Sequence, residues 1–155
     1  STSRRQRQMC IRDRNAGKDD LIRSGNQHSA LDRKTVLVVE DISSNYLLIS
    51  AMLSKHYNLL HAVNGEQAVA MVKEYKIDLL LMDMKMPVMD GLTATAEIRK
   101  FDTNIPIVAL TAHAFESDKV AALKSGCNDY LVKPVDKARL MSVLRKYCHP
   151  STLVL

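Results

Sequence analysis

The sequence has no tryptophan and few aromatic residues of any kind. Its 155 residues include two phenylalanines and five tyrosines, and none of these lies within the first 33 residues. That segment nevertheless carries eight Lys and Arg residues against four acids, a net charge of +4. A basic segment without aromatic rings lacks the platforms on which single-stranded nucleic acid stacks. We therefore expect no direct binding of nucleic acid.

Cysteine is scarce as well, and long apolar runs are absent. Cys10, Cys127 and Cys148 are odd in number and widely spaced, which indicates neither a disulfide framework nor a zinc site. Reduced thiols fit a cytoplasmic chain best. No apolar run approaches the roughly 18 residues that a membrane span needs, and no signal peptide is apparent. We therefore expect no membrane insertion by this chain.

Composition changes near residue 34. Residues 1–33 are rich in Arg, Gln, Ser and Asn, and we expect a disordered basic linker or a non-native tail there. Residues 34–155 carry 14 basic and 13 acidic residues, so the remainder is nearly neutral. We expect one folded domain over 34–148 and a C-terminal tail over 149–155. The absence of an initiator Met suggests a fragment.

Five short apolar runs alternate with helical patterns in the folded part. The runs span residues 35–39, 59–63, 78–82, 106–110 and 130–132. Strands that are apolar on both faces indicate a parallel sheet between two layers of helices. We predict an α/β fold, a doubly wound three-layer sandwich with the flavodoxin-like strand order 2-1-3-4-5. In its first helix, about 44–55, we place Leu47, Leu48, Ala51 and Met52 on the apolar stripe.

Polar residues follow four of these five strands. Glu40 and Asp41 follow the first strand, Asp83 the third, Thr111 the fourth and Lys133 the fifth. Sites in open parallel sheets lie beyond the carboxyl ends of the strands. If strands one and three are neighbours, about 4.8 Å apart, three carboxylates crowd together and need a cation. Oxygen ligands without Cys or clustered His favour Mg²⁺.

This set of residues suits the transfer of a phosphoryl group. A metal ion and an ammonium neutralise the phosphoryl oxygens, and a hydroxyl donates a hydrogen bond. Asp83 lies centrally and is the candidate nucleophile for an aspartyl phosphate. A Mg²⁺-dependent aspartyl-phosphate phosphohydrolase is the alternative. Such enzymes usually carry a second acid two residues after the nucleophile, where this sequence has Lys85.

Four motifs occur in a specific order and spacing: VVED at 38–41, MDMKMPVMDG at 82–91, ALTA at 109–112 and YLVKP at 130–134. Together they resemble the CheY-like receiver domain of two-component response regulators. The resemblance covers residues 34–148. The runs EDISSN at 40–45 and GCNDY at 126–130 are most similar to receivers attached to hybrid histidine kinases.

The resemblance implies a phosphoacceptor and a magnesium site. Asp83 corresponds to the phosphoacceptor. Asp41, Asp83 and the backbone carbonyl of Lys85 correspond to the magnesium ligands, and Glu40 to the acid that acts through water. Glu40 departs from the commoner Asp, which lengthens its reach.

The resemblance also implies a switch. Thr111 and Lys133 correspond to the hydroxyl and the ammonium that contact the phosphoryl group. Tyr130 corresponds to the aromatic residue that turns inward when the threonine moves. A cis bond before Pro134 is a further feature that the resemblance suggests. We interpret His56, His61, His113 and His149 as structural or solvent-facing, because they lack ligand spacing.

The function implied is that of a receiver in a two-component phosphorelay. It would take a phosphoryl group from the phosphohistidine of a histidine kinase or a histidine phosphotransfer protein. We expect a fragment of a hybrid kinase, cytoplasmic or the cytoplasmic part of a membrane-bound sensor; a stand-alone regulator is the alternative. No ATP-binding part is present, so we expect only self-phosphorylation and autodephosphorylation. The fourth helix, fifth strand and fifth helix would form the readout face, through which a dimer can form.

Overall fold

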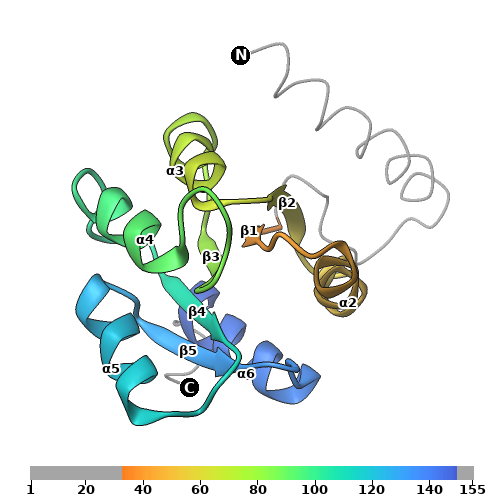
Figure 1. The fold of residues 1–155 in the computed structure, drawn as a ribbon. Coiled ribbons are helices and arrows are strands. Elements are labelled where there is room, and N and C mark those ends of the chain that lie inside the picture. Colours follow the sequence, from red (N-terminus) through yellow and green to blue (C-terminus); the bar gives the residue numbers. More distant parts are fainter. Residues whose placement is uncertain (1–32, 150–155) are drawn as a thin grey trace, which may run out of the picture. The chain divides into compact units, whose positions relative to one another are not determined.

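The computed structural model describes residues 33–149, which form five strands and five helices in alternation (Figure 1). The strands are β1 (Thr35–Val39), β2 (Asn58–Ala62), β3 (Leu79–Asp83), β4 (Ile107–Thr111) and β5 (Asp129–Val132). The helices are α2 (Ser43–Leu53), α3 (Gly65–Glu74), α4 (Gly91–Arg99), α5 (Glu116–Ser125) and α6 (Lys137–Cys148). The tails expected at 1–33 and 149–155 lie outside the described residues, apart from Arg33 and His149.

The strands form one parallel sheet in the order β2-β1-β3-β4-β5. The predicted order is therefore confirmed, and each strand begins and ends within about one residue of the expected run. Val39 pairs with Met82, and Asp83 pairs with Leu110. This register sets the end of β1 beside the end of β3 and brings the residues that follow them together.

Helices cover both faces of the sheet, with α2 and α6 on one side and α3, α4 and α5 on the other (Figure 1). Successive side chains of a strand point to opposite faces. Leu79 and Leu81 therefore join the core under α2 and α6, whereas Leu80 and Met82 join the core under the other three helices. All four are fully buried, which explains why β3 has no polar residue before its end. Within residues 33–149, no helix has the length and apolar content to cross a bilayer.

Side-chain caps mark the starts of three helices. Asn64 accepts a hydrogen bond from the amide of Gln67 at 2.8 Å, and Gln67 reaches back to the amide of Val63 at 3.0 Å. Asn64 and Gln67 thus form a reciprocal cap at the start of α3. Asp90 caps α4 and Asp136 caps α6 by accepting from the amide three residues on. Such caps pair amides that the first turn of a helix would otherwise leave without a partner.

The predicted apolar stripe of the first helix is correct only for Met52, which is partly buried against the core. Helix α2 buries Ile49 and Leu53, whereas Leu47 and Leu48 are 63% and 46% exposed. The segment from Tyr46 to Leu53 has apolar residues on nearly every side, so their spacing does not specify the inward face. Packing against the sheet decides it, because Ile49 and Leu53 share a core with β1 and β3.

The orientation of α2 can be tested with two neighbouring substitutions. We expect Ile49→Ala to lower the free energy of unfolding by about 2–5 kcal/mol, because it leaves a cavity in the core. We expect Leu48→Ala to change it by less than about 1 kcal/mol, because Leu48 is already half exposed. Urea unfolding followed by circular dichroism measures both. A larger loss for Leu48→Ala than for Ile49→Ala would contradict this orientation.

Candidate functional site

The carboxyl edge of the sheet brings three acids together. Glu40 and Asp41 follow β1, Asp83 is the last residue of β3, and these two strands are neighbours. One carboxylate oxygen from each of the three acids lies within 4.8 Å of the others. The crowding of acids expected from the sequence is therefore present. Glu40 is fully buried and Asp83 is 3% exposed, so neither charge is well hydrated.

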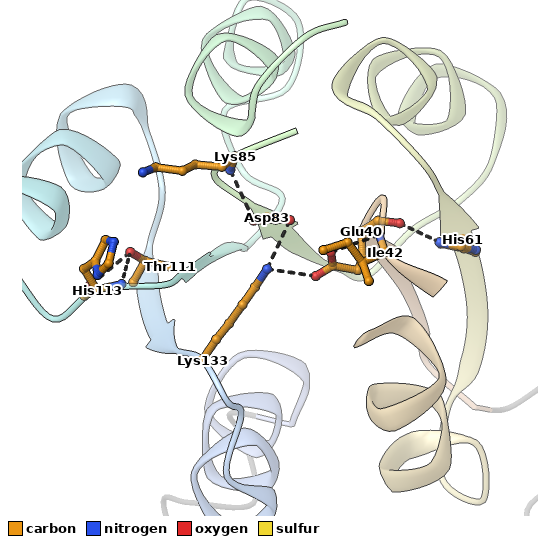
Figure 2. A network of polar contacts seen from close by, with 8 residues as sticks. All are labelled: Glu40, Ile42, His61, Asp83, Lys85, Thr111, His113 and Lys133. Carbon is orange, nitrogen blue, oxygen red and sulfur yellow. Dashed lines mark hydrogen bonds and ion pairs between the residues drawn. The ribbon is translucent and has the colours of Figure 1, made fainter. Parts of the chain in front are cut away.

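Lys133 lies between two of these acids (Figure 2). Its Nζ is 3.1 Å from Oε2 of Glu40 and 3.1 Å from Oδ2 of Asp83. Lys133 follows β5, and its side chain extends toward β3 and β1. The bond from Lys133 to Pro134 is cis, as the resemblance suggested.

The surroundings shift the pKa values of the two buried carboxyls in opposite directions. Burial alone raises the pKa of Glu40, but the ammonium of Lys133 and hydrogen bonds from Asp83 and the Ile42 amide together outweigh burial and hold that pKa below its usual value. Burial also raises the pKa of Asp83, and with the charge of Glu40 it brings that pKa to about 6, against the lowering effect of Lys133 and the Lys85 amide. Burial by itself would lower the pKa of Lys133, but its two acidic partners more than offset burial, and the pKa lies above its usual value. Glu40 thus stays ionised, and Asp83 is the more basic carboxylate.

The donor set fits a hard divalent cation. Three carboxylates face one ammonium, a formal excess of two negative charges. Oε2 of Glu40 is buried and lies 3.1 Å from the ammonium of Lys133, which also faces Asp83 and so offsets only part of the negative charge. Clustered carboxylate oxygens without sulfur or imidazole ligands are typical of sites for Mg²⁺. The adjoining pocket has a volume of about 370 Å³ and is lined by Asp41, Asp83, Lys85, Thr111 and Lys133, among others.

Thr111 ends β4 and lines the same pocket. Its hydroxyl donates to the carbonyl of His113 at 3.0 Å and accepts from the amide of His113 at 3.3 Å, so it is engaged within its own loop (Figure 2). On the other side of Asp83, the backbone amide of Lys85 donates to Oδ1 at 3.2 Å. Thr111 and Lys85 therefore both lie at the pocket, but only Lys85 contacts Asp83 directly.

Tyr130 lies on β5 and is half-buried beside the core under α3, α4 and α5. The pocket is lined by Thr111 but not by Tyr130. The ammonium of Lys119, from α5, lies 5.0 Å from the centre of the Tyr130 ring, in cation–π range. The structure thus places this predicted switch residue next to α5.

His61 contacts the site although its sequence position did not indicate it. Nε2 of His61, on β2, lies 2.8 Å from the backbone carbonyl oxygen of Glu40 (Figure 2). Its ring stacks on Tyr46 of α2, with centroids 3.8 Å apart and planes 9° apart. A single histidine in an apolar run has no spacing that predicts such a contact. Only the pairing of β2 with β1 reveals it.

Comparison with known proteins identifies the family. The model of the response regulator receiver domain matches residues 36–145. A hybrid signal transduction histidine kinase M from Dictyostelium discoideum is 40% identical over 119 residues, covering 72% of this chain and 5% of the relative. The sensor histidine kinase GacS from Pseudomonas protegens is 42% identical over 118 residues, covering 72% of this chain and 13% of the relative. The chain thus spans a small part of the length of these curated relatives.

Solved structures of similar chains share the fold. The receiver domain of the response regulator Ssk1 from Saccharomyces cerevisiae, in a co-crystal with the histidine phosphotransfer protein Ypd1, has a TM-score of 0.71 and 37% identity. That match covers 74% of this chain and 88% of the other. The receiver domain of sensor histidine kinase PA1611 from Pseudomonas aeruginosa, with a magnesium ion in its active-site cleft, has a TM-score of 0.70 and 39% identity. It covers 74% and 97% of the two chains.

The fold, the acidic edge of the sheet and these matches agree with one another. The chain belongs to the response regulator receiver domain family, and residues 36–145 are a receiver domain of two-component phosphorelay signalling.

Proposed function

We propose that Asp83 accepts the phosphoryl group of this relay. The observation that carries the proposal is the position of its carboxylate, within 4.8 Å of the other two acids and 3.1 Å from the ammonium of Lys133. Its pKa of about 6 leaves it mostly ionised at neutral pH, yet more basic than an ordinary aspartate. A carboxylate that is both ionised and basic is a competent nucleophile.

In the proposed step, an oxygen of Asp83 forms a bond to phosphorus as the bond from phosphorus to a partner's imidazole nitrogen breaks. The imidazole leaves with the bonding electron pair, and the product is an acyl phosphate. Lys133 lies where its charge can stabilise the phosphoryl oxygens. Thr111 lines the pocket and can turn its hydroxyl from the carbonyl of His113 toward a phosphoryl oxygen.

We also propose that this pocket holds Mg²⁺. Asp41, Asp83 and the backbone carbonyl of Lys85 would bind the ion directly, and Glu40 through water. When bound, the ion neutralises charge on the transferred phosphoryl group. The three clustered carboxylates, their excess of negative charge over the single ammonium of Lys133, and the magnesium ion in the structure of a 39% identical receiver support this assignment.

The proposed partner is a histidine kinase or a histidine phosphotransfer protein, such as the one bound to the similar receiver of Ssk1. We propose that the parent protein is a hybrid histidine kinase, since two hybrid signal transduction histidine kinases from Dictyostelium discoideum match at 40% identity. A stand-alone regulator is the alternative, because the match also covers 98% of the solved chain of a putative response regulator from Chloroflexus aurantiacus, at 28% identity.

We further propose that phosphorylation changes the surface around Tyr130. Thr111 ends β4 at the pocket, and Tyr130 lies on the neighbouring strand β5. If the Thr111 hydroxyl moves toward the phosphoryl group, its loop moves with it and Tyr130 can turn inward. The readout face would then comprise α5, β5 and α6, and a dimer of two receivers can form through it.

The phosphoacceptor can be tested by intact mass spectrometry. After exposure to acetyl phosphate and Mg²⁺, we expect the mass of one added phosphoryl group. The group should be absent with EDTA and in Asp83→Asn. Asp90→Asn is the matched control, because Asp90 also lines the pocket but its role as the cap of α4 is one that Asn fills equally well. A folded wild type that gains no phosphoryl group under these conditions would refute the proposal.

The raised pKa of Asp83 predicts a pH-dependent stability without metal. The folded-state pKa of about 6 exceeds the ordinary value of 3.8, so the folded state binds more protons between these values. Protonation of Asp83 therefore stabilises the folded state. This stabilisation is fully present below about pH 4 and is lost as the pH rises through about 6.

In EDTA near pH 7.5, we accordingly expect Asp83→Asn to be more stable than the wild type, with a free energy of unfolding about 1–3 kcal/mol higher. The difference should shrink as the pH falls toward 4. Urea unfolding across this pH range measures it, with Asp90→Asn as the control that shows no such trend. A variant that is less stable than the wild type near pH 7.5 would contradict the predicted sign.

The switch can be tested by NMR on the phosphorylated protein. We expect the ring resonances of Tyr130 to shift on phosphorylation in the wild type, because the ring changes its surroundings. In Thr111→Ala the phosphoryl group should still be added, but the Tyr130 shift should be lost. Tyr57, buried in the opposite core, serves as the internal control. An equal shift of the Tyr130 resonances in the wild type and in Thr111→Ala would contradict the proposal that the response of Tyr130 depends on Thr111.

A further inference from the structure

The backbone around Glu40 is held by the edge strand β2. The amide of Glu40 donates to the carbonyl of Ala62 at 3.0 Å, which continues the ladder one residue beyond β1. The carbonyl of Glu40 lies 2.8 Å from Nε2 of His61. Both peptide groups of Glu40 are therefore tied to two consecutive residues of one strand.

The contact between His61 and the Glu40 carbonyl affects the acidic side chains of the site. The carbonyl of Glu40 belongs to the peptide unit that joins Glu40 to Asp41, because a peptide group is planar and links two α-carbons. The torsion angles on either side of this unit, ψ of Glu40 and φ of Asp41, set the directions of the two acidic side chains relative to each other. A hydrogen bond donated to the oxygen of the unit restricts both torsions. His61 thus acts on two of the three clustered acids without touching either carboxylate.

Tyr46 sets the orientation of the His61 ring. The two rings lie 3.8 Å apart and are nearly parallel, at 9°, so the imidazole is held flat against the first turn of α2. In this orientation one edge of the imidazole faces the Glu40 carbonyl. A stacked ring has few alternative rotamers, which lowers the entropy lost on forming the hydrogen bond.

We propose that His61 is a positioning residue for the acidic pair Glu40 and Asp41, and that it raises the affinity of this pocket for Mg²⁺. The proposal rests on the proposed magnesium site. Groups that orient metal ligands by hydrogen bonds commonly change metal affinity about 10- to 100-fold when they are removed. Because His61 holds a backbone carbonyl rather than a ligand side chain, we expect a smaller effect, of about 3- to 10-fold.

Three substitutions separate the hydrogen bond from the ring. His61→Phe keeps an aromatic ring for stacking on Tyr46 but removes the donor. His61→Gln removes the ring but keeps an N–H donor at a similar reach. His56→Phe makes the same chemical change at an exposed histidine and is the matched control. Isothermal titration with MgCl₂ measures affinity, and urea unfolding shows whether each variant is folded.

For His61→Phe we expect the Kd for Mg²⁺ to rise about 3- to 10-fold. The Mg²⁺ concentration for half-maximal phosphorylation by acetyl phosphate should rise in step, while the rate at saturating Mg²⁺ returns to the wild-type value. His61→Gln should recover most of the affinity, and His56→Phe should retain all of it. If His61 had only a structural role, its replacement would lower the free energy of unfolding. It would not raise the Mg²⁺ concentration needed for phosphorylation while leaving the maximal rate unchanged.

An unchanged Kd in folded His61→Phe would overturn the proposal, and so would equal losses in His61→Phe and His61→Gln. A wild type that binds no Mg²⁺ would instead refute the proposed metal site. A second measurement needs no metal. Long-range ¹H–¹⁵N correlation should place a proton on Nε2 of His61, and the amide nitrogen of Asp41 should shift in His61→Phe but not in His56→Phe. A wild-type Nε2 without a proton would exclude the hydrogen bond.

Discussion

The structure of the site depends on one ammonium between two buried carboxylates. Glu40 and Asp83 are almost completely removed from water, and burial alone would favour the neutral form of each. Lys133 lies 3.1 Å from both and keeps Glu40 ionised. Burial and the charge of Glu40 then make Asp83 the more basic of the two. One carboxylate thus stays ionised and the other is the more basic, which is the property that the proposed nucleophile needs.

A parallel sheet is what makes this cluster possible. All the strands run in one direction, so the residues that follow β1, β3, β4 and β5 meet at one edge. Helices on both faces bury the central strands β3 and β4 completely and leave the strand ends for polar chemistry. The edge strand β2 brings no carboxylate to this edge. Its contribution is to hold the backbone of Glu40 through Ala62 and His61.

Much of this protein could be predicted from its sequence, because its signals are strong and local. Runs of four apolar residues followed directly by Asp83 or Thr111 have few interpretations other than buried parallel strands. The predicted strand order is confirmed, and the acids expected to crowd together do so. Helix α2 is the exception. Its apolar residues surround the helix, so the choice of Ile49 over Leu48 for the core depends on the neighbouring sheet.

The sequence by itself determined the elements, their order and the residues at the strand ends, since these follow from short-range patterns of apolar and polar side chains. The tertiary structure decided what those residues do to one another. The lowered pKa of Glu40 and the raised pKa of Asp83 depend on burial and on Lys133, which is distant in sequence from both. The contact of His61 with Glu40 likewise exists only because β2 pairs with β1. Electrostatics and hydrogen bonds depend on distance in space, which spacing along the chain does not specify.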